Sequence, residues 1–385
     1  MQLQSVFKSY FPRLVRLFLK PLVWGRKKLI FSLPHDAVWE FGEDEVVKIN
    51  LHPHIEQSAV PEVIDRYCRS YHLGKAFVCE VQNAELVGRN AVGVTQGHIL
   101  METVVGRWFV LEKSDLPKVL FRQVLPIEDE LDTVCSLVND WSRNYFHWMT
   151  ECLTRLEGLE VYQDKGNPKP KLMVNTRPSA WQVESLGLLG YQPEDWIEWQ
   201  MDRVKVKNLV IPSIRRYQEL SSAGAKFTDV MSPAACQWLR KRIFASLNLE
   251  QHQIQPSKRV FISRARATSR RIFNEAEVMQ HLAACGFRSY ILEEMTFSEQ
   301  VKLFAETEIV VAPHGAGLTN IMFCPEKTVV VELFGPPHYI RPDYFQLAHN
   351  LGLQYEYLLC IYQEYDLQVD INSLSQILRR YGVAS

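Results

Sequence analysis

Short apolar runs alternate with amphipathic segments through the second half of this chain. The runs at 258–262, 309–312 and 328–333 are rich in Val, Ile and Phe, and each predicts a buried strand. The segments 274–285 and 298–306 have the spacing of helices and separate these strands. Strands that alternate with helices predict a parallel sheet with helices on both faces. The pattern therefore indicates an α/β fold.

The first half of the chain has a different pattern. Between 76 and 110, short apolar stretches separated by Gly or Asn turns predict a β-meander. A helix is expected over 145–159. Further elements are expected as strands at 171–174, 204–211 and 288–292 and as helices at 181–189, 233–247 and 371–381.

The length of 385 residues and a hydrophobic content of 47% suit two domains with sizeable cores. We expect a first domain over 36–205 and a second over 206–342, with 343–385 packing back on the first domain. The net charge of −1 argues against nucleic acid as the main partner. The eight cysteines are scattered singly without a Cys-x-x-Cys pair, and no cleavable signal peptide is visible. Reduced cysteines in the cytoplasm are the simplest interpretation.

Residues 1–35 carry a charge of +7 without any acidic side chain, interleaved with aromatic residues and leucines. No window of this segment is apolar enough to span a bilayer. A basic, aromatic segment suits peripheral contact with a membrane surface through residues 1–30. The alternatives are a helix docked on the body of the protein or a frayed end.

A small-residue turn follows the strand at 309–312 and contains His314, Gly315, Ala316 and Gly317. A helix is expected to start directly after it. Small residues allow an anion to approach the backbone N–H groups and the positive end of a helix, so the turn predicts a phosphate site. The alternative is an ordinary connection between a strand and a helix.

Four arginines lie within eight residues just after the strand at 258–262. They are Arg264, Arg266, Arg270 and Arg271. The guanidinium fork matches phosphate oxygens, and Arg264 comes first after the strand, so we expect Arg264 to face a phosphate. Some of the other three are expected to be solvated loop charges. Asn274 is expected to cap the helix that follows.

The helix at 145–159 carries His147, Glu151 and Arg155 at positions i, i+4 and i+8, which places them on one face. An exposed, salt-bridged helix face would have the same spacing. A carboxylate or an imidazole could act as a general base here. Glu332 ends the strand at 328–333, where it could accept hydrogen bonds from ribose hydroxyls or be a solvent-exposed strand end.

Three sequence blocks together resemble glycosyltransferase family 61, and a looser fourth block follows at 344–355. The likeness extends over about residues 75–360. Thr154 departs from the family pattern, which often has proline there. The three blocks are Asn144–Arg155, Ile262–Arg264 with Asn274–Glu275, and Pro313–Asn320 with Val331–Phe334.

The resemblance implies two facing Rossmann-like domains of the GT-B type, a nucleotide-sugar donor and inversion at the anomeric carbon without a metal or other cofactor. It favours Glu151 as the base that activates a glycan or other hydroxyl acceptor, with His147 as the second choice. The secondary candidates in or near these blocks are Asn144, Arg155, Arg270 and Asn320.

We therefore expect an inverting, metal-independent glycosyltransferase that uses a UDP-sugar, in the synthesis of a polysaccharide. A non-catalytic relative that serves as a scaffold in a polysaccharide-assembly complex is the alternative. An oxidoreductase on a similar fold would need Gly-x-Gly-x-x-Gly after an early strand, and the chain has none.

Overall fold

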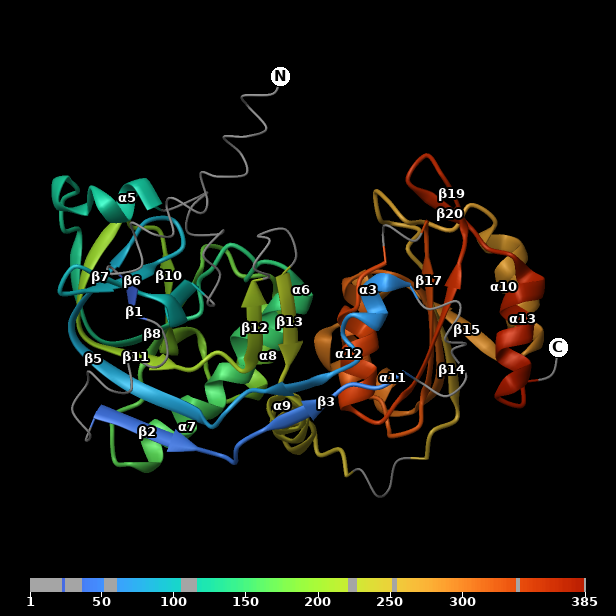
Figure 1. Ribbon diagram of the computed structural model, residues 1–385, viewed down its shortest axis with the longest axis horizontal. Coiled ribbons are helices and arrows are strands. Elements are labelled where there is room, and N and C mark those ends of the chain that lie inside the picture. The colour runs from blue at the N-terminus through green and yellow to red at the C-terminus, as the bar shows by residue number, and fades with distance from the viewer. Residues whose placement is uncertain are drawn as a thin grey trace. The chain divides into compact units, whose positions relative to one another are not determined.

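The computed structural model describes the backbone of residues 23–24 and residues 37–51, 61–104, 116–220, 227–250, 255–336 and 340–383. The chain divides into two compact units (Figure 1). Residues 1–46 and 72–235 form the first unit, and residues 47–71 and 236–385 form the second. Each unit has its own sheet and is described by itself.

The second unit contains a parallel five-stranded sheet in the order β15-β14-β16-β17-β18. Numbered along the chain, this order is 2-1-3-4-5, which defines a doubly wound α/β sheet. The order reverses between β14 and β16, and ligands bind outside the carboxyl ends of the strands at such a point. The strands are β14 (Lys258–Ile262), β15 (Phe287–Tyr290), β16 (Thr307–Pro313), β17 (Val329–Phe334) and β18 (Gln354–Leu359).

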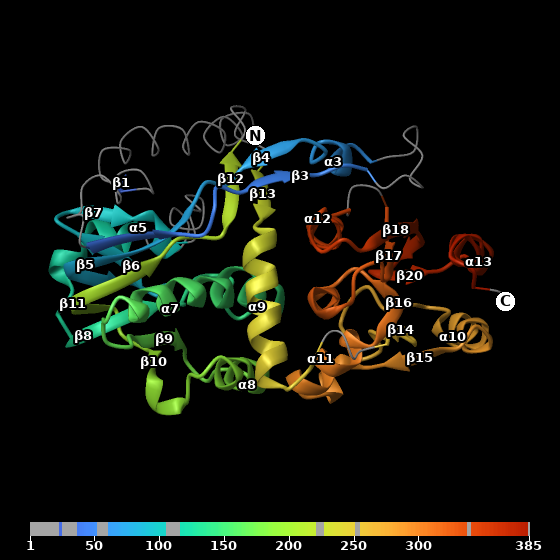
Figure 2. The same ribbon diagram turned by 90° about the horizontal axis from the view of Figure 1, so that it is seen from below.

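Helices cover both faces of this sheet, as its alternating pattern predicts. Helices α10 (Glu275–Ala284) and α13 (Ile371–Arg380) lie on one face, and α11 (Phe297–Ala305) and α12 (Asp343–Asn350) lie on the other (Figure 2). The core under α10 and α13 joins side chains from all five strands to both helices. Its members include Phe261, Val311, Val331, Val278 and Leu374.

The C-terminal residues differ from the expectation that 343–385 pack on the first domain. β18 pairs with β17 along its whole length, and Leu374, Ile377 and Leu378 of α13 belong to the core of the second unit. The expected break at 205/206 also differs, because the first unit continues to Ala235. A hairpin and a long helix follow β11, and hydrophobic periodicity alone does not assign them to a unit.

The first unit has a nine-stranded mixed sheet, in which β5, β6 and β7 form the predicted meander. Two strands were expected within β5, but it is continuous, and Asn83 takes a left-handed φ of 53° inside it. Strands β11, β8, β9 and β10 are parallel to one another, and β5 runs antiparallel to β11. This mixture differs from the parallel sheet of a Rossmann-like domain. The strands are β2 (Val38–Phe41), β5 (Ala76–Val87), β6 (Val92–Thr95), β7 (His98–Leu100), β8 (Asp129–Ser136), β9 (Lys171–Asn175), β10 (Trp196–Trp199) and β11 (Arg203–Pro212).

Helix α7 (Leu156–Asp164) packs on this sheet at Gly158. A Cβ there would lie 2.9 Å from the Cβ of Pro212, so only glycine allows the helix to approach β11 so closely. The smaller elements are β3 (Val46–Lys48), α3 (Glu62–Asp65), β4 (Ser70–His72), α5 (Leu116–Leu120), α8 (Ala180–Leu188), β12 (Arg216–Leu220), β13 (Phe227–Met231) and α9 (Pro233–Ser246).

Most of the basic N-terminal segment, and with it the expected membrane contact of residues 1–30, lies outside the described residues. The exception is the two-residue strand β1 (Val23–Trp24), which pairs in parallel with β7. None of the helices in the described ranges is long and apolar enough to cross a bilayer.

Candidate active site

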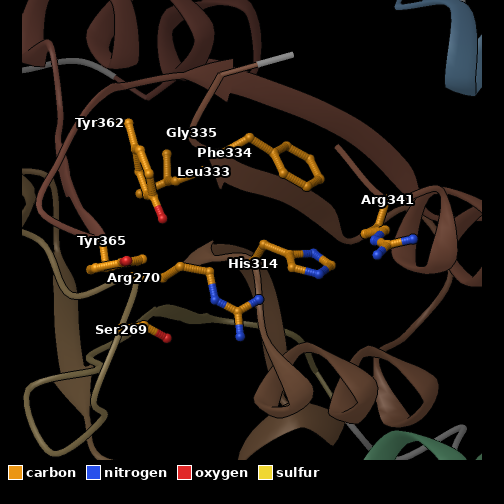
Figure 3. Close-up of a pocket in the computed structure, with 9 residues that line it drawn as sticks. All are labelled: Ser269, Arg270, His314, Leu333, Phe334, Gly335, Arg341, Tyr362 and Tyr365. Carbon is orange, nitrogen blue, oxygen red and sulfur yellow. The ribbon is translucent and has the colours of Figure 1, made fainter. Parts of the chain in front are cut away.

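A pocket of about 290 Å³ opens at the carboxyl edge of the parallel sheet in the second unit (Figure 3). Its wall is formed by the ends of β16 and β17 and by the loops after β14 and β18. The pocket therefore lies at the switch point of the sheet. The lining residues are Ser269, Arg270, His314, Leu333, Phe334, Gly335, Arg341, Tyr362 and Tyr365.

His314 is held in the wall of this pocket by a buried carboxylate. Its Nδ1 lies 2.6 Å from Oε1 of Glu332, and the hydroxyl of Tyr355 donates to Oε2 of Glu332 at 2.7 Å. The imidazole also stacks on the ring of Phe334, with 5.2 Å between the centroids. Since Nδ1 is engaged, Nε2 is the nitrogen that can serve a ligand.

Glu332 is fully buried, and burial raises the pKa of its carboxyl group. The interpretation of Glu332 as a solvent-exposed strand end is therefore wrong. With one oxygen on His314 and the other on Tyr355, the carboxylate positions the imidazole, and nothing in this geometry favours a direct contact with ribose.

Arg264 lies beside the glycine turn, as its place after β14 predicts. Its guanidinium donates to the carbonyl oxygen of Ser269 and packs so closely on Gly315 that a Cβ at that position would overlap it. Burial, followed by the nearby charge of Arg270, lowers the pKa of Arg264. Two guanidinium groups are thus held close together next to His314, which is an arrangement suited to an anion.

The other arginines of the cluster separate into two kinds. Arg266 pairs with Glu294 and Arg271 pairs with Asp366, and both arginines are largely exposed, as expected for solvated loop charges. Arg270 instead lines the pocket. Arg341 also lines it and was not found from the sequence, because it stands alone at a distance from every motif.

The small-residue turn differs from the prediction in one respect. It leads into a 3₁₀ helix, η11 (Ala316–Phe323), rather than into an α-helix. Within η11, Asn320 is buried and donates to Oε1 of Gln300 at 2.8 Å, so it has a structural role. A Cβ at Gly317 would approach Leu292 to 2.9 Å, so this glycine serves close packing. Ala316 is half-buried at the start of η11.

Asn274 stands at the N-cap position of α10, but its side chain does not cap the helix. Its amide nitrogen donates to the carbonyl oxygen of Val369, and its amide oxygen accepts from the backbone N–H of the same residue. Asn274 therefore fastens the arginine loop to the chain that follows β20 (Asp366–Gln368).

In the first unit, the predicted helix at 145–159 is irregular. It begins as α6 (Tyr145–His147), continues as a π-helical turn, η6 (Trp148–Cys152), and a 3₁₀ turn, η7 (Leu153–Arg155), and then becomes α7. Asn144 caps it by accepting from the backbone N–H groups of Phe146 and His147. π-Helical turns occur frequently at functional sites.

His147 and Glu151 come together, as their spacing predicts. Nδ1 of His147 lies 2.7 Å from Oε1 of Glu151. The side chain of His147 is 20% exposed, whereas that of Glu151 is 0% exposed, so this is not an exposed salt-bridged face. The ring of Trp141 lies beside the imidazole, with 5.3 Å between the centroids, and Trp141 itself is exposed.

The hairpin β12–β13 completes this cluster with two residues that carried no signal in the sequence. Nη1 of Arg216 donates to Oε1 of Glu151 and to Oδ2 of Asp229, each at 2.8 Å. Nη2 of Arg216 donates to the hydroxyl of Thr150 at 3.1 Å. Arg216 is distant from Glu151 in sequence, and only the fold brings the two together.

Arg155 does not join the polar stripe. It is buried, and it donates to the carbonyl oxygens of Pro212 at 3.2 Å and Ser136 at 3.1 Å. These bonds fix the helix to β8 and β11. Arg155 therefore has a structural role, and the expectation that it shares a functional face with His147 and Glu151 is wrong.

The described ranges contain no group of three or more His, Cys, Asp or Glu side chains placed to hold a metal ion. The positive charge around the pocket comes from Arg264, Arg270 and Arg341.

A basic pocket at the switch point of a doubly wound sheet, with a histidine held by a carboxylate, suits a ligand that carries phosphate. The comparison with known families gives the class of protein, because residues 145–331 match the family model Glycosyltransferase 61. These residues form a glycosyltransferase 61 domain, and the family predicted from the sequence blocks is confirmed.

Curated relatives match parts of the same region. Protein O-linked-mannose beta-1,4-N-acetylglucosaminyltransferase 2 of Xenopus laevis is 29% identical over 150 residues, which are 37% of this chain and 25% of the relative. The Mus musculus protein of the same name is 34% identical over 101 residues, or 24% of this chain and 17% of the relative. EGF domain-specific O-linked N-acetylglucosamine transferase of Gallus gallus is 30% identical over 121 residues. These residues are 30% of this chain and 22% of the relative. The matches thus span about a quarter or less of the length of these relatives.

The contact between Arg264 and Gly315 generates a first prediction. Gly315→Ala should displace the Arg264 guanidinium, since the new Cβ overlaps it, while the flexible side chain spares the fold. If Arg264 binds phosphate, loss of this charged hydrogen bond should weaken binding of inorganic pyrophosphate roughly 10-fold or more in calorimetric titration. Gly187→Ala is the control, because nothing lies within 4 Å of a Cβ there. Unchanged affinity in Gly315→Ala would remove Arg264 from the phosphate site.

The buried Glu332 generates a second prediction. The pKa of its carboxyl group is raised in the folded protein from the ordinary value of 4.5. As the pH rises above 4.5, the folded state therefore keeps this proton more strongly than the unfolded state does. This carboxyl group therefore favours folding at low pH, and its contribution is lost as the pH rises through the folded pKa. In urea unfolding, Glu332→Gln should gain stability relative to the wild type as the pH is raised from about 4 to 8. A stability difference that is constant over this range would contradict the prediction.

Proposed function

We propose that this protein is an inverting glycosyltransferase that moves a sugar from a nucleotide-sugar, with UDP as the nucleotide, to a hydroxyl of a glycan or other acceptor. The observation that carries the proposal is the pocket at the switch point of the second unit, in which Arg270, Arg341 and His314 meet. The family match and the transferase names of the relatives support the same class.

The donor side is proposed to lie in this pocket. A nucleoside diphosphate carries its charge on the phosphate oxygens, and guanidinium groups bind such oxygens through paired N–H donors. Nε2 of His314 would donate to a phosphate oxygen when the ring is protonated, and the Glu332 carboxylate beside Nδ1 compensates that positive charge. Arg264, close to Arg270, adds positive charge at the same edge of the sheet.

The proposed reaction is a single displacement. The acceptor oxygen attacks the anomeric carbon of the donor sugar, and its proton passes to the base. The bond between that carbon and the diphosphate oxygen breaks, and the electron pair stays on the diphosphate. Negative charge on the leaving group grows in the transition state, where preorganised donors such as Arg270 and His314 stabilise it. Attack opposite the leaving group inverts the configuration.

We propose His147 as the base, with Glu151 as its positioning residue. The family resemblance favours Glu151, but Glu151 is fully buried between His147 and Arg216, whereas His147 reaches the surface. An ionised carboxylate only accepts hydrogen bonds, so Nδ1 of His147 carries the hydrogen and Nε2 keeps the lone pair that a base needs. The exposed ring of Trp141 beside His147 offers an apolar face to an acceptor sugar.

Several finer expectations from the sequence belong to this proposal. They include a fold of the GT-B type and a role in polysaccharide synthesis. They also include a cytoplasmic location with peripheral membrane contact through residues 1–30. The division into two units supports the first of these, and the charge of +7 over residues 1–35 supports the last.

A screen of donor hydrolysis and transfer tests the proposal as a whole. The purified full chain is incubated with UDP- and GDP-sugars, and release of the nucleoside diphosphate is measured with and without glycan acceptors. Turnover with a UDP-sugar and inverted configuration in the product, determined by NMR, are expected. Donor binding without turnover would favour the alternative of a non-catalytic scaffold. No binding of any nucleotide-sugar would overturn the proposed donor class.

The base assignment gives a third prediction. His147→Ala should lower kcat by about 10²–10⁴-fold, which is the usual contribution of a general base, and leave donor affinity unchanged. Glu151→Gln should lower kcat less, because the imidazole remains but is less well held. Initial rates over a range of pH provide the measurement, and the loss of rate at low pH should disappear in His147→Ala.

His72→Ala is the matched control, since His72 is an exposed histidine of the first unit. A dead Glu151→Gln variant together with an active His147→Ala variant would restore Glu151 as the base. Full activity of both variants would place the base elsewhere in the first unit.

Metal independence gives a fourth prediction. Because guanidinium and imidazolium groups are proposed to neutralise the diphosphate, transfer should continue in EDTA with less than a roughly twofold change in rate. Metal analysis of the protein accompanies the assay. Loss of activity in EDTA that is reversed by Mn²⁺ or Mg²⁺ would show that a divalent ion carries this role.

A further inference from the structure

The hairpin formed by β19 (Ile361–Gln363) and β20 (Asp366–Gln368) has a tip that is unfavourable for its residues. The two residues between the strands, Glu364 and Tyr365, have φ values of 47° and 73°. A two-residue turn with both φ values positive is normally made by Asn-Gly or Gly-Gly. A tyrosine in this conformation is uncommon and indicates that its side chain serves a purpose.

The same tip is fastened to the arginine loop of the pocket. The backbone N–H of Arg270, which also has a left-handed φ of 57°, donates to the carbonyl oxygen of Tyr365 at 2.6 Å. The next residues along both segments are also in contact. Arg271 and Asp366 form an ion pair, and Ile272 and Leu367 form an isolated β-bridge. The backbone at Tyr365 is therefore fixed relative to that of Arg270.

Aromatic rings gather at this end of the pocket. Tyr362 and Tyr365 both line it, and Tyr365 is 69% exposed although its ring is large. Figure 3 shows the two tyrosines on one side, Arg341 on the other, and Arg270 and His314 between them. The ring of Tyr362 lies over Gly335, where a Cβ would come within 3.0 Å of it. The pocket thus has two tyrosines at one end, and Arg270, His314 and Arg341 lie along the rest with the Phe334 ring stacked on His314.

We infer that the β19–β20 hairpin binds the nucleobase of the donor, with Tyr365 and Tyr362 stacking on the base while Arg270 and His314 take the diphosphate. This inference rests on the proposed function and adds the orientation of the donor, with the nucleobase at the hairpin and the diphosphate at Arg270 and His314. A base is a flat π-system joined through ribose to a charged diphosphate, and the pocket presents aromatic and cationic groups in the same sequence. Stacking on an aromatic side chain contributes on the order of 1–3 kcal/mol per base, which corresponds to roughly a 5- to 150-fold change in affinity.

Calorimetric titration of the full chain with UDP and with inorganic pyrophosphate tests the inference. Tyr365→Gly should weaken UDP binding by roughly 5- to 150-fold and leave pyrophosphate binding unchanged. Because glycine suits the left-handed position, the melting temperature of this variant should be no lower than that of the wild type. A loss of affinity at unchanged or higher stability cannot come from unfolding of the hairpin. Tyr365→Phe, which keeps the ring, should bind UDP as the wild type does.

Ile361→Ala is the matched control, since Ile361 is an exposed residue of the same hairpin and is not among the residues that line the pocket. Two results would overturn the inference and leave the donor class intact. One is UDP binding that is unchanged in Tyr365→Gly, and the other is an equal loss for UDP and pyrophosphate, which would make the hairpin a support for the phosphate site only. A wild-type protein that binds no UDP would overturn the proposed function together with the inference.

Discussion

The buried carboxylate of Glu332 is the group around which the pocket of the second unit is organised. It lies at the end of a central strand without access to solvent, and a charge in such a place is tolerated only with hydrogen-bonding partners. Its partners are His314, which directly follows the neighbouring strand β16, and Tyr355 from the strand β18 on its other side. The need to satisfy one carboxylate thus ties β17 to the chain on both of its sides and orients the imidazole toward the pocket.

The two units each contain a histidine whose Nδ1 is held by a buried glutamate, but the third partner differs. Glu151 shares its carboxylate oxygen with Arg216, which also pairs with Asp229, so these three groups together carry a net charge of −1. This negative charge beside His147 suits its proposed role as a base. Glu332 instead has the uncharged Tyr355 as its second partner, and His314 faces a pocket lined by Arg270 and Arg341, which suits an anionic ligand.

The sequence predicted the second unit well because its signals are local. Buried parallel strands appear in the sequence as apolar runs. The residues directly after β14 and β16 lie at the same edge of a parallel sheet. The strand pattern alone is therefore enough to place Arg264 and His314 close together. The i, i+4 pair of His147 and Glu151 was found for the same reason. Arg155 at i+8 was misassigned, because the π-helical and 3₁₀ turns between have no signature in hydrophobic spacing.

Residues that depend on contacts between distant segments could not be predicted in this way. Arg216 and Asp229 reach Glu151 through a hairpin, and Arg341 and Tyr365 reach the pocket from chain that follows the last sequence motif of the sheet. Glu332 was found, but its hydrogen bond to Tyr355 was not, since Tyr355 lies on another strand.

In this pocket, the residues that stabilise the sheet differ from the residues that are available to contact a ligand. Glu332 at the strand end is buried and satisfied by its neighbours, whereas Arg270, Arg341, Tyr362 and Tyr365 stand on loops and a hairpin. Ile272 and Leu367 anchor the arginine loop and the hairpin to the core. The hairpin is joined to the arginine loop mainly by backbone hydrogen bonds and by the pair of Arg271 and Asp366. Because backbone bonds do not depend on side-chain identity, the residues at the hairpin tip can change without loosening the loop. The recognition of the outer part of a ligand can therefore vary on a constant sheet, while Glu332, which holds His314, remains fixed by its burial.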